Sequence, residues 1–317
     1  MNARFVSYRR QRGIAVITAL LLTTLAITIV ASLFWQQQVQ VRSIENQRLQ
    51  LQKQWILRGA LDWASLILRE DAKHSSVDNL DEPWAVPLAE TRLDQYVENG
   101  RADDNVGDAA LSGGISDAQA RYNLTNLCAN GTIDPTEVVV FERLLKNMRM
   151  NPVLAQATAE AMAVAQNPLA TKVANSSSEP STRPMNLTQM EDLLAVPGFS
   201  PEMLNKLKNF VIFLPRAAPV NVNTAPVEVL AARVGTLTAS DAASLVASRN
   251  AASFRDLADF VQRLPGKPFT ASANEASVTT QYFLVDGKVR MKRAELDVQA
   301  LIERNGVNTK IIWIREL

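Results

Sequence analysis

The stretch that decides the fold lies near the start of the chain, at residues 9–42: RRQRGIAVITALLLTTLAITIVASLFWQQQVQVR. Four arginines and no acidic residue precede Gly13, and Ile14–Trp35 then carries no charge. As a helix, Ile14–Trp35 would span about 33 Å at about 1.5 Å per residue, which is enough to cross a bilayer. The basic leader predicts that the N-terminus stays in the cytoplasm and that the rest lies across the membrane.

A cleaved secretory signal is the simplest alternative for this segment. The apolar core of such a signal is usually only about 7–15 residues long and ends at a cleavage site with small residues. Here the run is longer, and Val30–Ser32 (VAS) is a poor site followed by more apolar residues. We therefore expect the apolar segment to be retained.

The helical pattern continues well beyond the apolar run. The first proline is Pro83, and Gly59 is the only glycine between Gly13 and Gly100. Apolar residues recur on one helical face at Leu49, Ile56, Ala60, Trp63 and Ile67. This predicts one helix over residues 14–72, which spans the membrane at 14–35 and packs on a soluble domain further on.

The composition excludes several function classes. The 33 Lys and Arg residues balance 32 Asp and Glu residues, which argues against a general polyanion binder. Cys128 is the only cysteine, so no disulfide forms within the chain, and His74 is the only histidine. Because zinc sites and nucleophilic triads generally need a positioned imidazole, we predict no catalytic residue, no metal ligand and no enzyme.

The junction RQRG|IAVITALLL resembles the class III signal of type IV pilins. This resemblance implies that prepilin peptidase cuts between Gly13 and Ile14 and methylates Ile14 as the mature N-terminus. Pilins carry glutamate at the fifth mature position, where this chain has Thr18. A buried carboxylate is costly unless it is paired, and in a filament it pairs with the terminal amine of the subunit ahead. Its absence therefore fits a subunit at the filament tip.

Three further motifs resemble the minor pseudopilins of type II secretion, of the protein K family. They are Gly59-Ala60 with Trp63-Ala64, the segment Leu80–Leu88, and Asp117–Leu127, which we expect to be a strand. That family also lacks the fifth-position glutamate. The resemblance implies an α+β pseudopilin fold, in which a long transmembrane helix packs on an antiparallel sheet interrupted by a large all-α insertion. It assigns the pseudopilin domain to 73–128 and 275–317, and the insertion to 129–274.

Within the insertion, a helix is predicted to begin at Pro135, and two helix-turn-helix units follow. In the first, Pro197-Gly198 turns and Ser200 caps the next helix; in the second, Asn223 or Thr224 begins one helix and Ser240 or Asp241 another. These units resemble helix-hairpin-helix or SAM-like elements, so a membrane-anchored DNA-binding or DNA-uptake protein is the alternative function. Between Met185 and Pro265, however, seven basic residues are matched by seven acidic ones, which is poor support for non-specific DNA binding.

The end of the chain reads as β-structure. Runs rich in Val, Ile, Tyr and Phe alternate with the turn dipeptides Asp286-Gly287 and Asn305-Gly306. We predict three antiparallel strands. Small carboxylate groups elsewhere, at 78–82 and 103–108, are interpreted as solvated loop charge.

The resemblance implies a subunit at the tip of the type II secretion pseudopilus, which promotes pseudopilus assembly and the export of folded proteins. The implied partners are other minor pseudopilins, prepilin peptidase and the inner-membrane platform, together with the outer-membrane secretin and exoproteins; no nucleic acid is expected. The chain would cross the bacterial inner membrane once, with its bulk in the periplasm. The family often binds calcium through an acidic run, but the corresponding Ala163–Asn167 has no carboxylate, so no cofactor is expected. A signal-anchored periplasmic protein of another role stays a third alternative.

Overall fold

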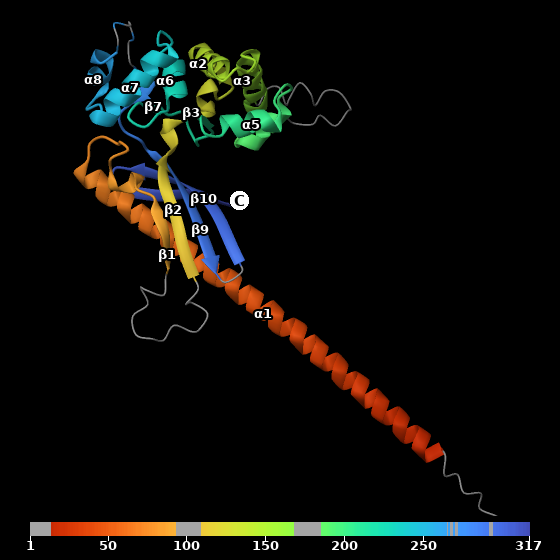
Figure 1. Cartoon of the computed structure of the whole chain (residues 1–317). Helices are drawn as coiled ribbons and strands as arrows, with labels where there is room; N and C mark the ends of the chain where they lie inside the picture. Colours follow the sequence, from red (N-terminus) through yellow and green to blue (C-terminus); the bar gives the residue numbers. More distant parts are fainter. Residues whose placement is uncertain are drawn as a thin grey trace, which may run out of the picture. The chain divides into compact units, whose positions relative to one another are not determined.

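The computed structural model describes residues 14–92, 109–167, 185–264, 266, 269, 272–291 and 294–317 (Figure 1). The chain divides into two compact units, Met1–Ile56 and Leu57–Leu317. The first consists, in its described part, of one helical segment. The second contains a sheet and a group of short helices.

Helix α1 runs from Ile14 to His74. The absence of proline and the single Gly59 allow this length, and Lys73 and His74 in the last turn suit the negative end of the helix dipole. All residues from Ile14 to Arg48 are exposed. Among the described helices, α1 is the one that is long and apolar enough to cross a membrane. A long N-terminal helix was predicted, and it ends two residues beyond the expected position 72.

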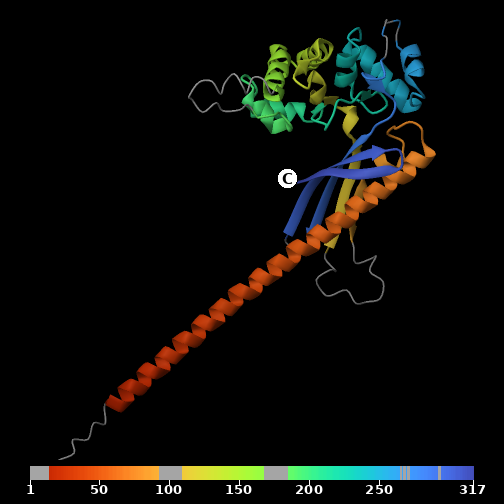
Figure 2. The ribbon, with the colours of Figure 1, turned by 180° about the vertical axis from the view of Figure 1, so that it is seen from behind.

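The second unit is built on a five-stranded antiparallel sheet in the order β1-β2-β9-β10-β11. Its strands are Leu88–Arg92 (β1), Ala109–Asp117 (β2), Tyr282–Met291 (β9), Ala294–Asn305 (β10) and Asn308–Glu316 (β11). The end of α1 lies along this sheet, as Figure 2 shows from behind, and buries Leu61, Ala64 and Leu68. The predicted antiparallel sheet and its three C-terminal strands are confirmed.

One predicted turn is wrong. Asp286-Gly287 lies inside β9, where Gly287 pairs with Gly113 of β2 and with Val298 of β10. Pairing on both sides keeps this dipeptide extended despite its local preference for a turn. Asn305-Gly306 does join β10 to β11, and Gly306 has the positive φ of 57° that this turn requires.

The expected strand over Asp117–Leu127 is also wrong. β2 ends at Asp117, and the 3₁₀ helix Ala118–Ala120 (η3), strand Tyr122–Asn123 (β3) and 3₁₀ helix Leu124–Leu127 (η4) follow. Each 3₁₀ turn is started by a side chain that precedes it: Asp117 accepts from the Gln119 amide at 2.7 Å, and Asn123 accepts from the Thr125 amide at 3.1 Å. These local bonds compete with an extended backbone.

The helical part packs around its own core, beyond one end of the sheet (Figure 1). Short strands tie it together: β3 with Val211–Ile212 (β6), Cys128–Ala129 (β4) with Thr132–Ile133 (β5), and Val220–Asn221 (β7) with Ala276–Ser277 (β8). The helices are Pro135–Asn147 (α2), Val153–Gln166 (α3), Pro201–Leu207 (α5), Val227–Arg233 (α6), Ala239–Ala251 (α7) and Leu257–Gln262 (α8), with 3₁₀ helices Pro83–Ala85 (η1) and Met190–Ala195 (η5).

Helix starts in this part follow the predicted caps only partly. As expected, Ser200 caps α5, whose first residue is Pro201, and α2 begins at Pro135. α6, however, begins at Val227 and not near Asn223 or Thr224, because the side chains of both residues form tertiary hydrogen bonds instead.

The two predicted helix-turn-helix units differ from each other. α7 is capped by Thr238, whose hydroxyl accepts from the Asp241 amide at 3.1 Å, and not by Ser240 or Asp241. The first unit contains only one α-helix, since η5 is a 3₁₀ helix. The helix-hairpin-helix or SAM-like assignment therefore stays a prediction.

Candidate functional site

The predicted processing site lies at the start of the described chain. Ile14 is the first residue of α1, and Gly13 lies outside the described residues. The Thr18 hydroxyl donates within its own helix to the carbonyl oxygens of Ile14 and Ala15, both at 3.1 Å. Such a bond satisfies the hydroxyl inside the apolar run. Thr18 thus needs no partner from another chain, in contrast to a buried carboxylate.

The rest of this segment is suited to lipid or to other apolar helices. Thr23, Thr24 and Thr28 make the same back-bonds to carbonyl oxygens one turn earlier, at 2.8 to 3.0 Å. Large apolar side chains such as Leu22 and Phe34 are 66% and 69% exposed. Contiguous apolar surface of this size marks an interaction with a membrane or a protein.

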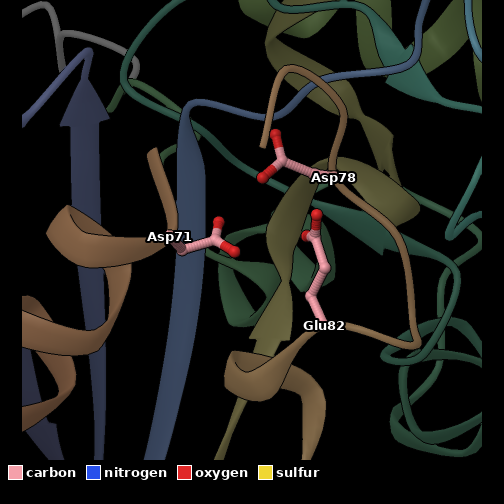
Figure 3. A group of neighbouring side chains, drawn as sticks. All are labelled: Asp71, Asp78 and Glu82. Carbon is pink, nitrogen blue, oxygen red and sulfur yellow. The ribbon is translucent and has the colours of Figure 1, made fainter. Parts of the chain in front are cut away.

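A second candidate is a carboxylate cluster at the end of α1 (Figure 3). The side chains of Asp71, Asp78 and Glu82 point toward one another, with carboxylate oxygens all within 4.8 Å. Asp78 and Glu82 are only 2% and 8% exposed. The interpretation of residues 78–82 as solvated loop charge is therefore wrong for these two residues, and the group at 103–108 lies outside the described residues.

Arg304 of β10 supplies the positive charge for this cluster. Its guanidinium donates to Asp71 Oδ2 at 2.7 Å, to Asp78 Oδ1 and, at 3.4 Å, to the Leu68 carbonyl, and it lies 4.6 Å from the centre of the Phe283 ring. Glu82 accepts instead from Trp84 Nε1 at 2.7 Å and from the Asn79 amide. Burial raises the pKa of the Asp71 and Asp78 carboxyls. The cluster therefore fastens the end of α1 to β10 by an internal cation.

A buried network around Asp117 joins the sheet to the helical part. Asp117 Oδ2 accepts from Thr224 Oγ1 at 2.6 Å and from Asn221 Nδ2 at 2.8 Å. The Asn221 amide also donates to the Asp78 carbonyl at 3.1 Å. Burial raises the pKa of Asp117 to about 6, despite these hydrogen bonds to its charged form. One carboxyl group thus links β2 to two residues of the insertion.

Two arginines of the helical part are buried. Arg233 forms a two-pronged ion pair with Glu137, at 2.6 and 3.0 Å, and only 1% of its side chain is exposed. Arg249 donates to the Val222 and Ala225 carbonyls, at 2.9 and 2.5 Å, and burial lowers its pKa to about 10. Two of the seven basic residues counted for DNA binding are therefore unable to reach phosphate, which weakens that alternative further.

The segment corresponding to the family's acidic run ends α3. Gln166 Oε1 accepts from the Gly131 amide at 3.0 Å and lies 3.6 Å from Cys128 Sγ, so it holds the β4–β5 hairpin. The other residues of Ala163–Asn167 offer one amide and no carboxylate. Calcium prefers several carboxylate oxygens, and this donor set does not fit it.

Sequence reasoning missed Arg304, Asp71 and Asp117 as site residues. Arg304 is 233 residues from Asp71 in the sequence and 226 from Asp78. No local motif connects them. The only signal in the sequence was Arg304 itself, the one arginine in β10.

The chain is similar to known proteins over most of its length. Two family models, both described as type II secretion system protein K, match residues 120–216 and 220–280. The type II secretion system protein K of Pseudomonas aeruginosa is 30% identical over 89% of this chain and 86% of its own length. That of Klebsiella pneumoniae is 26% identical over 94% of both chains.

A solved structure shares the architecture. The crystal structure of the GspK-GspI-GspJ complex from the enterotoxigenic Escherichia coli type 2 secretion system contains a chain that matches with a TM-score of 0.67 and 22% identity. The match covers 87% of this chain and 99% of the other. It supports the overall fold described above.

Proposed function

Because the chain belongs to the protein K family of type II secretion systems, and is thus a minor pseudopilin, we propose that it is the tip subunit of the pseudopilus. In this role it promotes pseudopilus assembly and the export of folded proteins across the outer membrane. The single observation that carries the tip position is Thr18, whose hydroxyl bonds to its own helix at the place where a filament subunit needs a carboxylate.

The physical reason concerns the neighbouring subunit. A carboxylate at the fifth mature position is stabilised only by the terminal amine of a subunit ahead. A tip subunit has no subunit ahead, so a carboxylate there would stay unpaired in an apolar surrounding. Threonine removes this cost, and its hydroxyl is satisfied by carbonyl oxygens of its own helix.

The proposed membrane topology follows from the charge pattern. Prepilin peptidase would remove residues 1–13 on the cytoplasmic side and methylate Ile14, and α1 would then hold the mature chain in the inner membrane. Leu57–Leu317 would lie in the periplasm. The inner-membrane platform is the proposed partner during assembly, and the secretin and exoproteins are proposed partners later.

Other minor pseudopilins are the proposed neighbours in the tip. The matched structure is that of a complex of GspK with GspI and GspJ, which supports equivalent partners here. The apolar surface of α1 offers the contact area for their helices. We propose a structural role without catalysis or a cofactor; the only histidine, His74, is exposed at the end of α1.

The tip position is tested by substituting Thr18. Thr18→Glu should reduce the amount of assembled pseudopilus severalfold in cells that lack the wild-type chain, because the new carboxylate has no amine to meet. Thr18→Val is the matched control. Valine has nearly the shape of threonine and, unlike glutamate, introduces no charge, so this variant should assemble normally. Immunogold labelling of sheared pseudopili should mark one end only. Label along the whole length, or a fully active Thr18→Glu variant, would refute the tip position.

A further inference from the structure

β11 is an edge strand of the five-stranded sheet. Within the described part of the chain β11 pairs only with β10, so one side of its backbone carries unpaired N–H and C=O groups. The strand covers Asn308–Glu316, nine residues, which is longer than the typical strand of about 5–6. Long free edges are usually shortened or covered in soluble proteins, because they pair readily with other strands.

The register shows which side chains of β11 face the helical part. Trp313 lies opposite Leu301 of β10, and Arg315 lies opposite Gln299. Leu301 packs with Ile212 and Leu214 of the helical part, and Trp313 packs against the same cluster. Successive strand residues alternate between faces, so Arg315 points to this side as well.

A groove of about 700 Å³ follows this side of β11. Trp313 and Phe213 contribute the aromatic groups and Arg315 and Arg216 the charged ones, and among the described residues no carboxylate lines the groove. The remaining polar lining consists of neutral hydroxyl and amide groups from Thr125, Asn130, Gln166, Asn186 and Thr188. The groove therefore favours an anionic group over a cationic one.

The two arginines differ in how far their charge is neutralised. Arg216 is paired with Glu303 at 2.7 Å, although 55% of its side chain is exposed. Arg315 lies over the Trp313 ring, 4.3 Å from its centre, and among the described residues no carboxylate pairs with it. A second groove on the same side of β11, of about 680 Å³, is also lined by Trp313 and Arg315, and the charged residues along it are three acidic and three basic. Arg315 is thus the cation of the first groove that the described carboxylates leave unpaired.

We propose that β11 is a docking edge for an extended segment of a partner protein, which adds as a sixth strand and places a carboxylate side chain in the groove beside Arg315. Main-chain hydrogen bonds along the free edge would supply affinity, and the groove would select acidic side chains at alternate positions. The proposal concerns this edge alone and holds whether or not the chain occupies the pseudopilus tip.

The test uses the purified full chain in detergent micelles. The probe is a fluorescein-labelled ten-residue peptide in which valine and glutamate alternate; a valine–lysine peptide of equal length is its control. Fluorescence anisotropy should show the glutamate peptide binding at least about tenfold more tightly than the lysine peptide. Arg315→Glu should abolish this preference, while Arg255→Glu, an exposed charge outside both grooves, should leave it unchanged.

Backbone pairing is tested on the peptide itself. Only every second amide of an added strand points to the edge of the sheet. N-methylation of one alternate set of amides should therefore abolish binding, and N-methylation of the other set should preserve it. Equal binding of the two methylated peptides, equal binding of the glutamate and lysine peptides, or no effect of Arg315→Glu in a chain with unchanged circular dichroism would each overturn the proposal. If sedimentation shows that the full chain forms a dimer, a second copy of the chain would be the occupant of the edge. That result would also overturn the proposal.

Discussion

Arg304 provides the counter-charge for a cluster of buried carboxylates. Its guanidinium lies among Asp71, Asp78 and Glu82, where three carboxylates alone would be strongly destabilising. The pattern of charges in the sequence around residues 78–82 is that of an ordinary polar loop. Only the fold brings the arginine to it from a distant strand, which is why the sequence did not predict the cluster.

Replacing Arg304 should therefore be costly. Arg304→Gln leaves buried carboxylates without their counter-charge and is expected to lower the free energy of unfolding by about 3–5 kcal/mol. The measurement is chemical unfolding of the full chain in detergent, followed by near-ultraviolet circular dichroism. Arg290→Gln is the matched control, since its pair with Glu90 is about half exposed on both sides, and it should cost less than about 1 kcal/mol. Similar losses in the two variants would contradict the role assigned to Arg304.

The raised pKa of Asp117 should make the free energy of unfolding depend on pH. Its pKa is about 6 in the folded chain and about 3.9 when unfolded, so the folded state binds the proton more tightly. Between about pH 6 and pH 4, this group therefore makes the folded state more stable as the pH falls, by roughly 1–3 kcal/mol. Asp117→Asn should lack this contribution, while Asp71 and Asp78, whose pKa values are also raised, still titrate in both proteins. Unfolding free energies measured from pH 7 to 4.5 that stay parallel for wild type and variant would exclude the assignment.

At the scale of elements, periodicity and caps predict most of the helices and strands. The long helix, the start of α2 at Pro135, the cap of α5 at Ser200 and the Asn305-Gly306 turn depend on neighbours in sequence. Errors occur where a distant partner competes. Asp286-Gly287 stays extended between two strands, and Thr224 bonds to Asp117 instead of beginning a helix.

The glycine pair in the sheet gives a test at this scale. A Cβ on Gly113 of β2 would collide with the Asp286 carbonyl oxygen of β9, whereas a Cβ on Gly114 would meet Pro87 at an ordinary 3.8 Å. Gly113→Ala should lower the free energy of unfolding by about 1–3 kcal/mol. Gly114→Ala is its neighbour control and should change it by less than about 0.5 kcal/mol. The same unfolding measurement applies, and a harmless Gly113→Ala would show that β2 and β9 are not paired in this register.

At the scale of the whole molecule, the N-terminal helical segment and Leu57–Leu317 are two separate compact units. The apolar part of α1 is exposed, its hydroxyl groups bond within the helix, and it is long enough to cross a membrane. Leu57–Leu317 carries its own core and its own buried ion pairs. The sequence predicted Gly13, Ile14 and Thr18 as site residues because their motif is contiguous, and these three assignments stay predictions.

The measurement that tests the central claim most directly is the mature N-terminus. The chain is co-expressed with prepilin peptidase, purified from membranes, and analysed by mass spectrometry of the intact protein and its first peptide; cells without the peptidase serve as control. The expected product begins at an N-methylated Ile14 and retains all of α1. A chain that keeps residues 1–13 in the presence of the peptidase, or that begins near Ser32, would contradict it.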